Sequence, residues 1–250
     1  MKFNIIASGS KGNATIIKYK DSILLIDMGI TLTRLQEGLK EWDLKLDQLS
    51  GALFTHDHGD HIRGLRFISP KICYSTRGTL TSLCNEIDFY QPFLVGEFKI
   101  TPYKTSHDAT NPCCYLIEAG EEKLAYVTDT GYMLEETINA FKNVNYLIIE
   151  SNHDIQMLLK TNRPLELKER IMSDHGHLCN EDSAVAAANI VGPDTKEIVL
   201  AHLSEEANTP ELAISAYEKI FHYFGKDVHQ YILKCANQNH SVQGGNLDED

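Results

Sequence analysis

A short polar segment directly after an apolar run, THDHGDH at 55–61, constrains this chain more than any other feature. The preceding residues, GALFT at 51–55, are typical of a buried strand. In an extended backbone His56 and His58, two residues apart, project to the same side, where they can share one cation. Asp60 and His61 follow at an expected helix start and direct a second pair of ligands at a neighbouring site. The segment therefore predicts a metal-binding loop, against the weaker alternative of a polar surface loop with incidental histidines.

The composition is that of a globular chain that needs no metal merely to fold. The 250 residues are 42% hydrophobic and 23% charged, and a chain of this length buries about 70–75% of its extended surface. We therefore expect any metal site to be functional. The 23 Lys and Arg residues against 35 Asp and Glu residues give a net charge of −12. This balance argues against a protein held on nucleic acid by overall positive charge, but it leaves room for a local basic patch.

The six cysteines indicate a reducing compartment. They form no C-x-x-C pair, so they are typical of buried free thiols and not of a disulfide framework or a thiolate zinc site. The N-terminal residues MKFNIIASGS lack the pattern of a signal peptide. No apolar run approaches the ~18–20 residues that span a bilayer. We expect a cytoplasmic protein with no membrane segment, of an oligomeric state that the sequence leaves open.

Short apolar runs typical of strands alternate with helical patterns along the chain. We find no internal repeat and no change of composition that marks a boundary, so residues 1–235 are expected to form a single domain. Residues 236–250 are polar and acidic and contain glycine, which predicts a poorly ordered tail. Strands are predicted at 3–7, 14–19, 22–27, 51–55, 71–74, 97–103, 114–119, 123–129, 145–150 and 197–202, and helices at 31–42, 132–142, 153–160, 165–172, 180–190 and 209–224.

The segment at 55–61 resembles the H-x-H-x-D-H signature of the metallo-β-lactamase superfamily. The resemblance implies an α/β (α+β) fold, a four-layer αββα sandwich with a metal site at one edge of its two sheets. It also implies later ligands at strand ends, and the matching positions are His107 in KTSHDA, Asp129 in YVTDTGY and His202 in VLAHLS. If the family's ligand pattern applies to these positions, His56, His58 and His107 hold one metal. Asp60, His61 and His202 hold the other, and Asp129 bridges the two.

This ligand set predicts two divalent cations, with Mn or Zn suited to it and Fe as a further candidate. Two such ions activate a shared hydroxide and stabilise the attacking and leaving oxygens of a phosphodiester. Asp60 and His177 are the predicted catalytic residues, the first as a metal ligand and the second for phosphate binding or protonation of the leaving group. The sequence therefore predicts a metal-dependent phosphodiester hydrolase.

A narrower resemblance covers nearly the whole chain. The segments ASGSKGNA, LIDMG, THDHGDHIRGL, IIESNHD, SDHGHLCNEDSA and LAHLSEEANTPE are similar to the YycJ/WalJ subfamily of bacterial metal-dependent hydrolases. The resemblance implies a 5′-to-3′ double-stranded DNA exonuclease that acts on DNA ends with Mn²⁺. Cys179 stands where the subfamily has Ser. The alternatives are a phosphodiesterase of the same fold that acts on a cyclic nucleotide or RNA, and a non-catalytic metal-bound interaction module.

Further polar residues are candidates for binding substrate or orienting the ligands. For each of them, local capping, packing or turn formation is the alternative. A nuclease also requires a positive lip near the metals, for which the candidates are Lys11, Arg34, Arg63, Arg66, Lys71 and Arg77. The candidates for substrate binding or ligand orientation are Ser10, Asn13, Asp27, Asn152, His153, Asp154 and His175.

Overall fold

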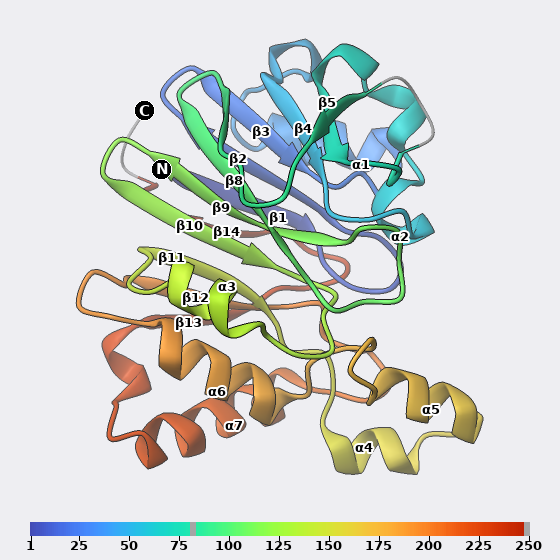
Figure 1. The fold of residues 1–250 in the computed structure, drawn as a ribbon, viewed down its shortest axis with the longest axis vertical. Coiled ribbons are helices and arrows are strands. Elements are labelled where there is room, and N and C mark those ends of the chain that lie inside the picture. The colour runs from blue at the N-terminus through green and yellow to red at the C-terminus, as the bar shows by residue number, and fades with distance from the viewer. Residues whose placement is uncertain (81–83, 248–250) are drawn as a thin grey trace.

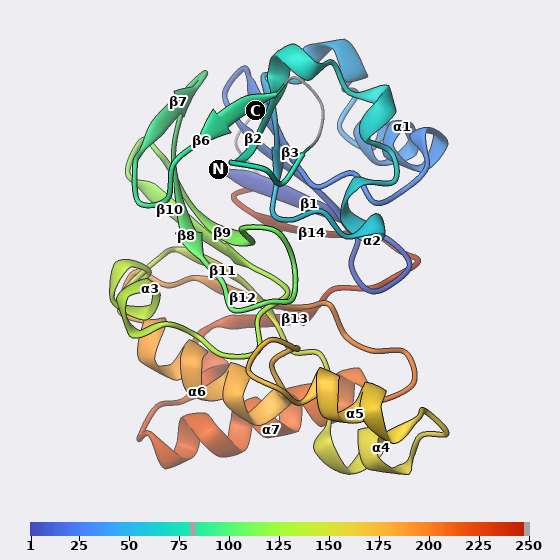
Figure 2. The ribbon, with the colours of Figure 1, turned by 45° about the vertical axis from the view of Figure 1, so that its right-hand side comes forward.

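The computed structural model of the protein describes residues 1–80 and 84–247. Its strands form two seven-stranded sheets. The sheets pack face to face, and helices cover both outer faces (Figures 1 and 2). The prediction of a four-layer αββα sandwich of the α/β (α+β) class is confirmed.

The first sheet contains the N-terminal strands and has the order β14-β1-β2-β3-β4-β5-β6. Neighbouring strands run antiparallel from β14 to β3 and parallel from β3 to β6. Its strands are β1 (Lys2–Ala7), β2 (Ala14–Tyr19), β3 (Ser22–Ile26), β4 (Gly51–Phe54), β5 (Cys73–Thr76), β6 (Asn85–Ile87) and β14 (Val242–Gly245).

The second sheet has the order β13-β12-β11-β10-β9-β8-β7. Neighbouring strands run parallel from β13 to β10 and antiparallel from β10 to β7. Its strands are β7 (Phe93–Val95), β8 (Phe98–Lys104), β9 (Cys113–Ala119), β10 (Glu122–Val127), β11 (Tyr146–Glu150), β12 (Glu197–Ala201) and β13 (Ile232–Cys235).

The helices lie against the outer faces of the sheets or at the rim of the sandwich. Figure 1 shows α6 and α7 beneath the second sheet, whereas α4 and α5 project beyond it. Among the described helices, none combines the length and the hydropathy needed to cross a bilayer. They are α1 (Leu32–Lys40), α2 (Gly59–Ile62), α3 (Glu135–Ala140), α4 (Ile155–Lys160), α5 (Leu165–Ile171), α6 (Asn180–Ile190) and α7 (Pro210–Tyr223).

Apolar side chains fill the three interfaces between the four layers. Phe3 and Tyr115 are fully buried in the core between the two sheets. Leu35 of α1 packs on the outer face of the first sheet, and Tyr217 and Phe221 of α7 pack on the outer face of the second. Each such side chain contributes about 1.5–3 kcal/mol of hydrophobic burial. Burial of apolar side chains on both faces of each sheet therefore stabilises the sandwich.

Two hydrogen bonds join the sheets next to the segment that carries the sequence motif. The buried Tyr115 hydroxyl donates to the Phe54 carbonyl at 2.7 Å, and the Cys113 amide donates to the Thr55 carbonyl at 2.9 Å. The parallel strands β3 and β4 of one sheet and β10, β11 and β12 of the other therefore end at one shared edge. In folds with parallel strands the carboxyl ends are where ligands bind.

The predicted strands and helices are found within a few residues of their expected bounds, but four strands were missed. These are β6, β7, β13 and β14, which are short and lack a clear alternation of apolar and polar residues. The prediction of a poorly ordered tail at 236–250 is wrong for β14, because Val242–Gly245 pair with β1 in antiparallel register. Residues 248–250 lie outside the described residues. The six cysteines are free thiols, as expected.

We expect removal of residues 241–250 to destabilise the protein by about 2–4 kcal/mol. The truncation deletes the four residue pairs between β14 and β1, and a backbone hydrogen bond contributes about 1 kcal/mol net. Denaturant unfolding followed by circular dichroism measures the change. Removal of residues 248–250 is the control and is expected to leave the unfolding midpoint unchanged. Equal midpoints for the two truncations would show that β14 contributes nothing.

Candidate metal centre and active site

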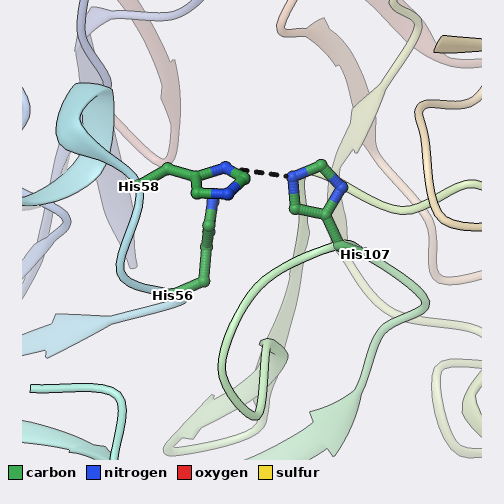
Figure 3. A group of neighbouring side chains, drawn as sticks. All are labelled: His56, His58 and His107. Atoms are coloured by element: carbon green, nitrogen blue, oxygen red, sulfur yellow. Dashed lines mark hydrogen bonds between the residues drawn. The ribbon is translucent and has the colours of Figure 1, made fainter. Parts of the chain in front are cut away.

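The loop after β4 holds two histidines of the first ligand group in an extended conformation. His58 precedes α2 with φ −67° and ψ 147°, so His56 and His58 project to one side, as the sequence predicts. Figure 3 shows that the rings of His56 and His58 meet and that the His58 ring faces the ring of His107, which follows β8. His58 Nδ1 lies 3.3 Å from His107 Nε2. One nitrogen of each of the three rings lies within 4.8 Å of the others, a spacing that suits a single cation.

The second group comes from α2 and from the end of β12. Asp60 and His61 lie in the single turn of α2, the helix start that the sequence predicts, and His202 follows β12. The Asp60 Oδ2 atom lies 3.6 Å from His61 Nε2 and 3.8 Å from His202 Nε2. These three side chains also meet within 4.8 Å.

The Asp129 carboxylate lies between the two groups. Its Oδ2 atom is 3.2 Å from His61 Nε2, and its Oδ1 atom is 3.9 Å from His107 Nε2. It is 2% exposed, and His61 is fully buried. The structure thus brings all seven residues that the sequence resemblance selects as ligands into one cluster.

Three residues of the site have left-handed backbone conformations. Asp27, Asp129 and His202 have φ values of +59°, +57° and +55°, and each follows a parallel strand, β3, β10 or β12. Such a conformation is strained for a residue with a side chain, and it persists where surrounding contacts over-determine it. Here it turns each side chain from the strand direction into the cluster.

A buried carboxylate orients the His61 ring. His61 Nδ1 donates to Asp27 Oδ2 at 2.8 Å, and Asp27 also accepts from the Thr55 amide at 2.9 Å. Because Nδ1 is engaged in this way, Nε2 faces Asp60 and Asp129. Partners of this kind fix the tautomer of a ligand histidine and raise its basicity.

Glu150, at the end of β11, orients the rings of two histidines in the same way. The sequence did not lead us to predict this residue. Its Oε1 atom accepts from His202 Nδ1 and from His177 Nδ1, both at 2.8 Å. Its Oε2 atom accepts from the amides of Thr130 and Leu178 at 3.1 and 3.2 Å. The available signal was an acidic residue that ends an otherwise apolar, fully buried strand.

Protonation of the metal-free site follows from its buried carboxylates. Burial by itself lowers the pKa of His61, but the charges of Asp129 and Asp27 outweigh this and raise it to about 10. The pKa of His202 is likewise raised, against its burial, by Asp129, Asp60 and Glu150. Burial acts to raise the pKa of Asp129, but His202 and His61 hold it well below its usual range. The buried carboxylates of the cluster therefore require positive charge to compensate them, which protons on His61 and His202 supply in the metal-free protein.

A divalent cation would supply this positive charge and also bind polar atoms of the cluster that have no hydrogen-bond partner among the described residues. His56 Nε2, Asp129 Oδ2 and His202 Nε2 are buried inside the cluster without a hydrogen-bond partner in the described part of the chain. Buried polar atoms are normally paired, so these atoms are placed for a ligand. Imidazole together with carboxylate is a donor set that suits Zn, Mn and Fe.

Two predicted asparagines contact the ligands directly. Asn13 Nδ2 lies 3.0 Å from His61 Nε2. Asn152 Nδ2 donates to the His202 carbonyl at 2.9 Å, which helps to hold the strained residue in place. Ser10 is exposed in the β1–β2 loop that carries Asn13.

The other predicted residues divide between the cluster and its surroundings. His177 is 20% exposed beside Glu150, and His175 is exposed with its Nδ1 3.2 Å from Ser106 Oγ. Asp154 lies outside the cluster, because its carboxylate caps α4 by accepting from the Met157 amide at 2.7 Å. His153 is buried, and burial lowers its pKa to about 4.

An open hollow of about 530 Å³ lies over the first ligand group. Of the predicted positive lip, Arg63 donates to the Lys11 carbonyl, whereas Arg34 donates to the Ile6 carbonyl and Arg77 pairs with Glu86. The residues that line the hollow are Asp57, His58, His107, Asp108, Ala109, Thr110 and His175.

Comparison with known proteins defines the class first. Residues 23–203 match the β-lactamase superfamily domain, and the chain belongs to this superfamily as a metal-dependent hydrolase. A solved structure of similar fold is the metallo-β-lactamase fold protein YhfI from Bacillus subtilis, with a TM-score of 0.72 at 19% identity over 97% of this chain and 99% of that one. Human tRNase Z, short form, has a TM-score of 0.62 at 16% identity over 97% and 98%. At such identities the likeness shows the fold alone.

Within this class the chain belongs to the YycJ/WalJ family, so the narrower resemblance is confirmed. It is 36% identical over 227 residues to exodeoxyribonuclease YycJ of Bacillus anthracis, covering 85% of this chain and 86% of that protein. It is 34% identical over 228 residues to exodeoxyribonuclease WalJ of Streptococcus pneumoniae serotype 2, covering 85% of each.

We expect Asp27→Asn to weaken binding of Zn²⁺ by about 10- to 100-fold, the usual effect of losing the partner of a ligand histidine. The amide keeps the shape of the side chain but removes the charge that fixes His61. Competition with a chromogenic chelator measures the affinity. The control is Asp21→Asn, which changes an exposed turn carboxylate and is expected to bind as wild type. Equal affinities for both variants would exclude His61 as a ligand that depends on Asp27.

Metal binding is expected to release protons at pH 7–8. The pKa of His61 is raised to about 10 in the metal-free protein, so this ring is protonated there and must lose its proton to ligate. The apparent affinity therefore rises with pH until about pH 10. Calorimetric titration with Zn²⁺ in two buffers of different ionisation enthalpy counts the released protons. A binding enthalpy that is independent of the buffer would contradict this expectation.

Proposed function

We propose that this hydrolase is a nuclease that degrades double-stranded DNA from its ends in the 5′-to-3′ direction with two divalent metal ions, Mn or Zn. The observation that carries the proposal is the convergence of seven His and Asp side chains into two groups around the Asp129 carboxylate. Similarity to the exodeoxyribonucleases YycJ and WalJ supports DNA as the substrate.

Each ligand group would hold one ion. His56, His58 and His107 suit the first, and Asp60, His61 and His202 suit the second, while the Asp129 carboxylate faces both. When bound, such a pair of ions supplies an activated water near neutral pH and positive charge beside the phosphodiester oxygens. Side chains of the protein itself carry out the remaining steps.

His177 is placed to move a proton at the edge of the site. Its Nδ1 is engaged by the buried Glu150 carboxylate, so Nε2 is left for the substrate, and the ring is 20% exposed. The tilted His202 ring lies 5.2 Å away between centroids. In this position His177 donates a proton to the departing oxygen through Nε2, and the hydrogen bond to Glu150 fixes the orientation of its ring. The catalytic residues of the proposal are therefore Asp60 and His177.

The open hollow over the first ligand group favours a long substrate over one that is enclosed. Its lining includes the exposed His175 together with His58 and His107, so His175 is placed to bind a part of the substrate that extends beyond the first group. A cyclic nucleotide or RNA remains an outcome of the test below, because its diester would meet the same ligands.

We expect Asp60→Ala to lower Mn²⁺-dependent digestion of end-labelled linear duplex DNA by about 1,000-fold or more, as expected for loss of charge stabilisation in the transition state. The measurement follows the release of label from 5′ ends, beside closed circular DNA, RNA and cyclic nucleotides. Asp47→Ala, which removes an exposed carboxylate from the 3₁₀ turn Leu46–Gln48, is the control and is expected to be fully active.

The same assay separates the parts of the proposal. His177→Gln is expected to keep the metal content of the wild type while slowing turnover. Digestion that starts at 3′ ends would contradict the polarity, and cleavage of cyclic nucleotides or RNA with intact DNA would replace the substrate. Full activity of Asp60→Ala would rule out the second ion.

A further inference from the structure

Two cationic side chains lie beside the second ligand group. Lys11 is in the β1–β2 loop, and Arg63 follows α2. Arg63 Nη1 donates to the Lys11 carbonyl at 3.2 Å, and the Asn13 amide of the same loop donates to the Asp60 carbonyl at 2.8 Å. The β1–β2 loop, which carries Lys11, therefore lies against Asp60 and Arg63, and both cationic residues are on the same side of the centre.

Arg170 of α5 lies beside the first group. Its Nε donates to Asp108 Oδ2, and Asp108 Oδ1 lies 3.5 Å from His107 Nε2. The Asp108 carboxylate therefore lies between the Arg170 guanidinium and the His107 ring of the first group. The sequence-based lip did not include Arg170, because its helix lies far along the chain from the metal-binding loop.

The two cationic positions lie on opposite sides of the metal centre. Figure 2 shows α2 and the β1–β2 loop on one side of the site edge and α5 on the other, and Figure 1 agrees. The open hollow lined by His58, His107 and Asp108 lies on the α5 side. A chain of phosphates that runs over both ligand groups would meet a cation at each end.

The charge of the surroundings makes these cations necessary for an anionic polymer. The protein has a net charge of −12, and Asp60, Asp108 and Asp129 surround the centre. The side chains of Lys11 and Arg170 are 67% and 56% exposed, and they pair with Glu205 and Asp108. Exposed ion pairs contribute only about 0–1 kcal/mol, so they hold the cations in place and still yield to a phosphate, with which arginine makes stronger, charge-assisted bonds.

We propose that Lys11 and Arg63 on one side and Arg170 on the other form a two-part surface that binds the phosphate backbone of one DNA strand across the metal centre. This inference rests on the proposed function and specifies how its substrate is held. It requires a substrate with phosphates on both sides of the cleaved bond. A diester with a single phosphate reaches the metals without touching either part.

The test compares kcat/KM on linear duplex DNA with that on bis(4-nitrophenyl) phosphate, a diester with one phosphate, in the Mn²⁺-loaded full-length protein. Lys11→Gln and Arg170→Gln are each expected to lower kcat/KM about 10-fold on DNA, the effect of one charge-assisted hydrogen bond, and less than twofold on the small diester. The double variant is expected to lose about 100-fold on DNA, because the two positions are separate and act on one strand.

Salt dependence supplies a second readout. Each substitution is expected to reduce the slope of log kcat/KM on DNA against log salt concentration by about one, since one phosphate contact is lost. The matched control is Lys142→Gln, which removes one exposed positive charge. Lys142 precedes β11, whose other end carries Glu150. It is expected to keep the wild-type rate and slope.

The outcomes separate this inference from the proposed function. Equal losses on DNA and on the small diester would overturn it, because the substitutions would then act through the metal centre. Variants that match Lys142→Gln on DNA would overturn it as well. A wild-type protein that cleaves the small diester but no DNA would refute the proposed function itself, and the inference with it.

Discussion

The buried Asp129 carboxylate, facing His61 on one side and His202 on the other, is the interaction on which the site depends. His61 belongs to the edge of the first sheet and His202 to that of the second, so this charge joins the two halves of the sandwich. A buried carboxylate is unfavourable by several kcal/mol unless cations compensate it. Protons on the two histidines do so in the metal-free protein, since the pKa values of His61 and His202 are both raised, and metal binding would replace these protons.

Hydrogen bonds to two further buried carboxylates orient the ligand histidines around this charge. Asp27 and Glu150 are buried carboxylates that each end a parallel strand region and engage the Nδ1 atoms of His61 and His202. They leave the Nε2 atoms directed inward, while the left-handed backbone of Asp27, Asp129 and His202 turns the side chains off their strands. The strain is balanced by the hydrogen bonds that it makes possible.

The same arrangement reconciles an acidic protein with an anionic substrate. The net charge of the protein is −12, and the ligand carboxylates of Asp60 and Asp129 themselves repel phosphate until metal binds. Cations at the rim, Lys11 and Arg63 on one side and Arg170 on the other, add attraction where a strand would pass. Local placement of charge, and not its sum, therefore decides what such a site can bind.

Much of the fold and of the ligand set could be predicted from the sequence, because these features are encoded locally. The motif at 55–61 places four ligand-type side chains within one turn and one strand end, and apolar runs mark the strands that follow. His107, Asp129 and His202 were chosen by family resemblance at strand ends, and the structure brings them to the same cluster. Such positions are predictable because a strand end fixes the edge at which its next residue lies.

What only the tertiary structure decided depends on contacts between distant segments. Glu150 looked like the end of an apolar strand until the fold placed His177 and His202 against it. Arg170 became part of the rim because α5 lies beside Asp108, and β14 forms because its backbone groups pair with β1. The sequence by itself determined the four ligand-type side chains of the motif at 55–61, since their spacing is local, and family resemblance added the three later positions. The fold decided which partners orient them and where the substrate is held, because those contacts require chain segments to meet across the sandwich.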